Sequence, residues 1–76
     1  MLSNVERLES VLSQLGRPGT CEATIAILKG MSAGEQAKVA TQFSTQMRGL
    51  TLQYPRFAAD APIAAQAAAD AVALGL

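Results

Sequence analysis

Residues 32–54 read SAGEQAKVATQFSTQMRGLTLQY, the longest segment of the chain with one clear helical period. Ser32 and Glu35 match a capping box at its start, and Pro55 cannot continue a helix at its end. Gly49 either marks the close approach of another helix or is simply tolerated. The pattern predicts one central helix over residues 33–53, whose apolar face consists of Val39, Ala40, Phe43, Met47, Leu50 and Tyr54.

Two shorter helices are predicted before it. Ser3 and Glu6 form a second potential capping box, and an apolar stripe then continues to a Gly and a Pro that stop a helix, so we expect a helix over residues 4–15. Thr20 is suited to cap a further helix over residues 21–29, which is apolar over much of its surface.

The last predicted helix covers residues 61–74 and is dominated by alanine. Asp60 is suited to cap it, and Pro62 falls in its first turn, where a missing N–H is harmless. Alanine forms helices readily but buries little area. This helix therefore packs either on its own chain or on another protein, and the sequence leaves both possibilities open.

Together these patterns predict an all-α fold, a bundle of four helices in a single domain over residues 1–76. Such a small core rarely supplies more than about 3–5 kcal/mol of stability, so self-association into an oligomer would help it. The predicted core is Val5, Leu8, Val11, Leu12, Leu15, Ile25, Leu28, Val39, Phe43, Met47, Leu50, Phe57, Ile63 and Val72.

The residue inventory speaks against several classes of site. Cys21 is the only cysteine and there is no histidine, which excludes an intramolecular disulfide and an ordinary zinc site. Without histidine, neither a Ser-His-Asp triad nor a Cys-His pair exists. Glu6 and Glu9 lie one turn apart on an exposed helix side, a solvated arrangement. We therefore expect no enzyme, no catalytic residue, no cofactor and no metal, and we interpret Cys21 as a small buried hydrophobe.

Charge and hydropathy limit the partners. The six basic and six acidic residues are dispersed, so no basic patch favours nucleic-acid binding. The most apolar segment, residues 57–76, contains Asp60 and Asp70, and a charge at a bilayer centre costs about 2.5–3.5 kcal/mol, so we expect no membrane span. A free thiol and the lack of a signal-like N-terminus suit a reducing, cytoplasmic location.

One pattern offers a DNA-binding alternative. The predicted helices 21–29 and 33–53, joined through Gly30, have the order of a helix-turn-helix. The match weakens at Lys29 and Gln36, where such motifs carry apolar residues. The first turns of the would-be recognition helix also contain a single residue suited to base readout, Gln36, and it lies beside Glu35, which repels phosphate.

The preferred interpretation is a non-enzymatic protein–protein interaction module: a small adaptor, inhibitor or assembly factor that also self-associates. Its partners are then another protein and a second copy of the chain. Aromatic and arginine residues are enriched at binding hot spots, which favours the corner at residues 52–57, and the alanine face of the last helix is the second candidate. The predicted protein-binding residues are Tyr54, Arg56, Phe57, Ala64, Ala68 and Ala71.

Overall fold

The structure, a computed structural model, describes residues 1–75. The all-α prediction is confirmed, but these residues form six helices where four were predicted. They are α1 (Asn4–Leu12), α2 (Thr20–Lys29), α3 (Ala33–Gln42), α4 (Ser44–Gln53), α5 (Pro55–Asp60) and α6 (Pro62–Ala73).

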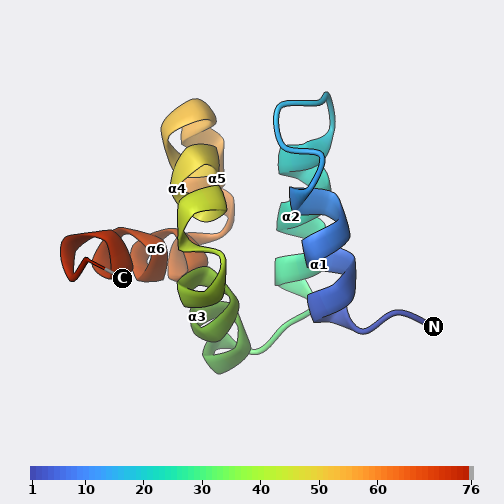
Figure 1. Cartoon of the computed structure of the whole chain (residues 1–76), viewed down its shortest axis with the longest axis horizontal. Helices are drawn as coiled ribbons and strands as arrows, with labels where there is room; N and C mark the ends of the chain where they lie inside the picture. The colour runs from blue at the N-terminus through green and yellow to red at the C-terminus, as the bar shows by residue number, and fades with distance from the viewer. Residues whose placement is uncertain (76) are drawn as a thin grey trace.

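The helices are arranged as a hairpin and a second group that packs beside it. Helices α1 and α2 run antiparallel, and a short connection leads from α2 to α3 (Figure 1). Helices α3 and α4 follow one another, and α6 crosses them and packs against both. Helix α5 lies against α4 and α6 and also touches α2, so it links the second group to the hairpin.

The predicted central helix is broken at Phe43, which corrects the expectation of one helix over residues 33–53. The backbone there has φ −111° and ψ 37°, outside the helical region. Neither glycine nor proline causes the break, since the local sequence is Thr-Gln-Phe-Ser-Thr. Because α6 packs against both α3 and α4, tertiary contacts override a local sequence that favours a continuous helix.

The first helix is shorter than predicted, ending at Leu12 and not at residue 15. The next residues form tighter turns, in which the Gln14 N–H donates to the Val11 carbonyl (3.0 Å) and the Leu15 N–H to the Leu12 carbonyl (3.1 Å). This tightening rotates Leu15 away from the core stripe and leaves it 38% exposed.

The segment after the central region was expected to be a connection, and it forms the additional helix α5. Pro55 both ends α4 and occupies the first position of α5, where its fixed φ suits a helix start. One turn of helix then places Phe57 fully inside the protein. Phe57 was predicted to lie in the core, and its burial agrees with that prediction.

Two of the predicted caps are present and two are replaced. In both serine capping boxes the glutamate N–H donates to the serine hydroxyl, at 3.1 Å for Ser3 and 3.3 Å for Ser32. Thr20 lies inside α2, and its hydroxyl donates instead to the Gln14 and Arg17 carbonyls, both at 2.9 Å. Asp60 does not cap α6, because its carboxylate pairs with an arginine in α5.

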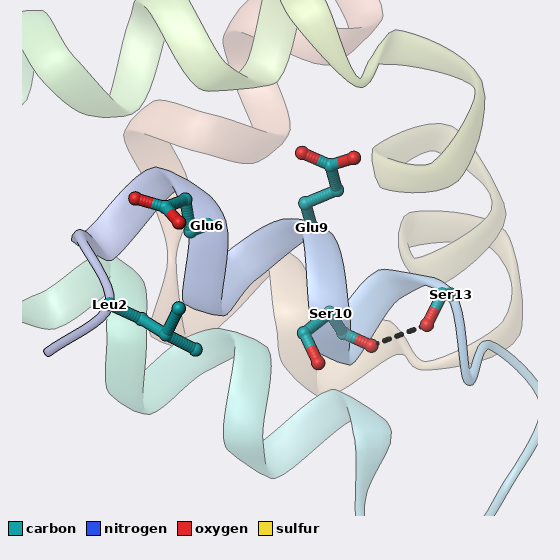
Figure 2. Close-up of a pocket in the computed structure, with 5 residues that line it drawn as sticks. All are labelled: Leu2, Glu6, Glu9, Ser10 and Ser13. Atoms are coloured by element: carbon teal, nitrogen blue, oxygen red, sulfur yellow. Dashed lines mark hydrogen bonds between the residues drawn. The ribbon is translucent and has the colours of Figure 1, made fainter.

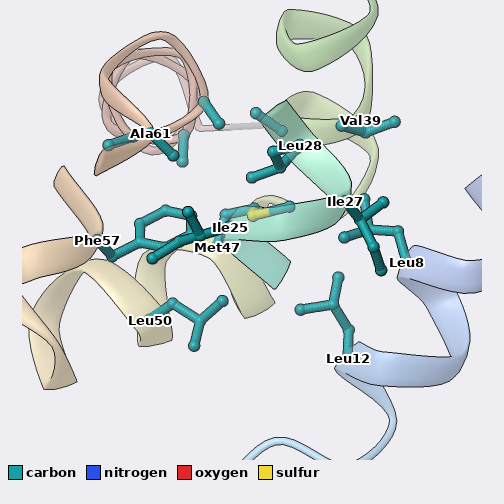
Figure 3. Close-up of a cluster of buried hydrophobic side chains, with 14 of the residues drawn as sticks. Leu8, Leu12, Ile25, Ile27, Leu28, Val39, Met47, Leu50, Phe57 and Ala61 are labelled. Carbon is teal, nitrogen blue, oxygen red and sulfur yellow. The ribbon is translucent and has the colours of Figure 1, made fainter. Parts of the chain in front are cut away.

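The core contains most of the predicted residues, and Figure 3 shows side chains from α1, α2, α4 and α5 meeting in it. Val5, Leu15 and Ile63 are wrong predictions, since they are 37%, 38% and 43% exposed. Phe43, Val11 and Val72 are half-buried. Alanines of α6 and of the junction before it take the place of larger side chains: Ala61, Ala64, Ala65, Ala68 and Ala71 are all buried.

Gly49 offers a test of the packing between α4 and the end of the hairpin. A Cβ built at Gly49 would lie 3.6 Å from Leu15 Cδ2, an ordinary van der Waals contact. We expect Gly49→Ala to raise the free energy of unfolding by about 0.5–1 kcal/mol, since glycine disfavours helix interiors by that amount. Urea denaturation followed by circular dichroism measures the change.

The matched control for this substitution is Gly16→Ala. Gly16 has φ +96°, a left-handed conformation that L-residues rarely adopt, although no atom lies within 4 Å of its added Cβ. Gly16→Ala should lower stability by about 1–2 kcal/mol. A loss of stability in Gly49→Ala would contradict the observed spacing between α4 and Leu15.

Candidate functional site

The structure separates the six predicted binding residues into two groups. Phe57, Ala64, Ala68 and Ala71 have at most 3% of their surface exposed, so they belong to the core. The alanine face of α6 therefore packs on α3 and α4 of its own chain. Tyr54 and Arg56 keep surface that a partner can reach, and their role in binding stays a prediction.

Arg56 joins two helices through its guanidinium group. Its Nε donates to Asp60 Oδ2 at 2.9 Å, one turn further along α5, and its Nη2 lies 3.5 Å from Glu22 Oε1 on α2. Arg56 and Glu22 are well exposed and Asp60 is about a third exposed, so solvent screens these ion pairs and each contributes about 0–1 kcal/mol. Arg56 thus has intramolecular partners that any binding contact must share or replace.

Tyr54 lies at the junction between α4 and α5 and is half-buried against the core. Its N–H donates to the Leu50 carbonyl at 2.8 Å, which closes the last turn of α4. Its neighbour Leu52 is far more accessible, with 73% of its surface exposed. The most exposed apolar side chain of the predicted corner is therefore Leu52.

Leu52 lines a groove between α4 and α6, hereafter the α4–α6 groove, with a volume of about 220 Å³. Its walls are mainly apolar: Arg48, Thr51, Leu52, Ala69 and Val72. Leu74, just beyond α6, is a further accessible leucine and is 76% exposed. Among residues 1–75 the Arg48 side chain has no ion pair, so the groove combines exposed hydrophobic surface with an unpaired positive charge.

A second hollow lies along α1 and is lined by Leu2, Glu6, Glu9, Ser10 and Ser13 (Figure 2). It follows a single helix and its end, and all five of these residues are exposed. The Ser13 hydroxyl donates to the Ser10 carbonyl at 2.6 Å, and the Glu6 carboxylate serves its capping box. No desolvated carboxylate is available here for acid–base chemistry, which requires a closed cleft.

Cys21 is 3% exposed and lies in the core near the start of α2. Burial raises the pKa of its thiol above the ordinary value of 9.0, nearby Glu22 and Asp60 raise it further, and Arg56 acts in the opposite direction. The thiolate is therefore scarce near neutral pH, which agrees with the interpretation of Cys21 as a buried hydrophobe and not as a nucleophile.

The helix-turn-helix alternative gains no geometric support from the connection between α2 and α3. The side-chain amide of Gln36, the proposed base-reading residue, donates to the Leu28 carbonyl at 2.8 Å and to the Met31 carbonyl at 3.4 Å. It therefore caps the end of α2 and faces its own chain. DNA binding stays the alternative prediction.

Residues 1–75 contain no cluster of three or more His, Cys, Asp or Glu side chains with the spacing of a metal site. None of their helices has the length and hydropathy needed to cross a bilayer.

Comparison with known proteins gives no relative from which a function could be inferred: no family model, curated protein or solved structure matches the chain. The geometry of the α4–α6 groove is therefore the evidence for it as a candidate binding site. The sequence predicted a binding surface at the corner of residues 52–57. It did not single out Leu52 or the residues of α6 that face it, Ala69 and Val72. The available signal was that Leu52 lies out of phase with the apolar face of its helix, two residues from both Leu50 and Tyr54.

Proposed function

We propose that this protein is a non-enzymatic binding module that self-associates and docks another protein, as an adaptor, inhibitor or assembly factor does. The observation that supports docking most directly is the exposure of Leu52 at the edge of the α4–α6 groove. When a partner covers an exposed leucine beside an apolar groove, the complex is stabilised by about 25 cal/mol per Å² of apolar surface removed from water.

The chemistry of the groove defines the partner segment that fits it. Apolar side chains of that segment contact Leu52, Ala69 and Val72, and a carboxylate pairs with Arg48 at the rim. The segment is therefore amphipathic and acidic, such as one face of a short helix. Arg48 makes the encounter sensitive to salt, because screening weakens exposed charge pairs.

The test is a substitution in the groove. Leu52→Glu places a negative charge in the groove, and we expect it to weaken partner capture at least about tenfold while the helical content stays unchanged. The measurement is a pull-down from host lysate with and without nuclease treatment, followed by titration of the captured protein against wild type and variant.

Leu2→Glu is the matched control, since Leu2 is 56% exposed on the distant N-terminal segment. It should leave capture unchanged. Equal capture by wild type and Leu52→Glu would exclude the groove as the docking site, and capture that disappears with nuclease would favour the DNA-binding alternative.

A further inference from the structure

Three non-helical junctions separate the helices of the second half of the chain. They lie at Phe43, Tyr54 and Ala61, with φ/ψ of −111°/37°, −128°/93° and −131°/62°. At the last two a proline follows directly, and proline prevents the flanking helices from joining. After Phe43 comes Ser44, so no residue type prevents α3 and α4 from joining into one helix.

The Phe43 junction also lacks the features that normally terminate helices. Phe43, the residue before α4, provides no side-chain cap, and the end of α3 has neither a glycine nor a left-handed residue. Backbone bonds flank the break, from the Phe43 N–H to the Val39 carbonyl (2.8 Å) and from the Met47 N–H to the Phe43 carbonyl (2.9 Å). Joining α3 to α4 would remove two helix ends and their incompletely paired backbone groups.

Tertiary contacts between the two halves of the chain hold the junction broken. Helix α6 packs on α3, and α5 touches α2. The shared core includes Leu8, Leu12, Ile25, Leu28 and Val39 from α1–α3, and Met47, Leu50, Phe57, Ala64 and Ala68 from α4–α6. A second copy carries both of these surfaces, so the same contacts can form between two chains.

We propose that residues 42–45 are a hinge through which two copies of this chain exchange halves. In the exchanged dimer α3 and α4 form one continuous helix, and α4–α6 of each copy pack on α1–α3 of the other. The interface then is the core itself, which contains the fully buried Leu8, Leu28, Met47, Leu50 and Phe57. A short hinge promotes such exchange.

This inference rests on the self-association in the proposed function and gives it a structural route. It predicts that a proline at the junction blocks the dimer. Ser44→Pro keeps a proline-compatible helix start, as at α5 and α6, but prevents a continuous helix.

The experiment refolds each protein from denaturant at low and high concentration and measures its mass by light scattering after gel filtration. We expect wild type to form a dimer of twice 7.9 kDa at high concentration. Ser44→Pro should remain monomeric with wild-type helicity, and a Gly-Gly insertion after Phe43 provides a second blocked variant should the proline variant not fold.

Subunit exchange distinguishes this dimer from one formed by surface docking. Tagged and untagged wild-type dimers are mixed, and the formation of hybrid dimers is followed over time. In an exchanged dimer, hybrids form slowly because the core must first open. Dimers formed by surface docking re-equilibrate at once. Slow hybrid formation with monomeric blocked variants supports the hinge. A dimer that persists in the blocked variants and is lost in Leu52→Glu overturns the exchange but keeps the proposed self-association. If the wild type stays monomeric, both the exchange and the self-association are overturned. The docking of another protein is then tested by the capture experiment alone.

Discussion

Replacing Phe57 with alanine is expected to lower the free energy of unfolding by about 3–5 kcal/mol, enough to unfold most of the protein at room temperature. Phe57 is the largest fully buried side chain, and α5 has only six residues in which to hold it. Its ring lies beside Met47 and Ile25 in the core, so its removal leaves a cavity between α5, α4 and α2 (Figure 3). Thermal and urea denaturation followed by circular dichroism measure the loss.

Arg56→Ala is the control for this experiment, since Arg56 precedes Phe57 in the same helix but is exposed. It removes the two screened ion pairs and should cost less than about 1 kcal/mol. A Phe57→Ala protein with wild-type stability would show that α5 does not anchor the second half of the chain.

The second large effect is expected from Ala68→Leu. Ala68 is 1% exposed in α6, which crosses α3 and α4 (Figure 1). A leucine there needs space that the neighbouring helices occupy, and overpacking of this kind typically costs about 1–3 kcal/mol. The same denaturation measurements apply, and increased binding of a hydrophobic dye would report the loosened packing of α6.

Ala73→Leu makes the same chemical change at an exposed position of the same helix. Because both residues are good helix formers, this control should leave stability within about 0.5 kcal/mol of wild type. Equal stability of Ala68→Leu and Ala73→Leu would contradict close packing of α6 on α3 and α4.

Several helix ends are set by local residues, and the sequence predicted these ends. The serine capping boxes of α1 and α3 and the proline after α4 gave the helix starts and stops correctly. The break at Phe43 was not predictable from its neighbours, because it depends on α6, which lies some twenty residues further along the chain. Helix α5 was missed because Pro55 was interpreted only as a stop and not also as a start.

The candidate site was predicted less well than the fold, for a physical reason. Residue type indicated that Phe57 and the alanines of α6 suit an interface, but the same properties suit a core, and the structure uses them in the core. Only the packing of α6 against α4 shows which face of each helix remains open. Leu52 became a candidate because that packing leaves it at the edge of a groove.

The alanine face of α6 also has an evolutionary consequence. Positions 64, 68 and 71 lie where neighbouring helices approach closely, so substitutions accepted there should be limited to residues of similar size, such as glycine, serine or cysteine. The opposite side of the helix, at positions 63, 66 and 70, faces outward and should vary freely in size and charge. Divergent descendants of this sequence should therefore keep a recurring pattern of small residues at helical spacing here, even where little other similarity remains.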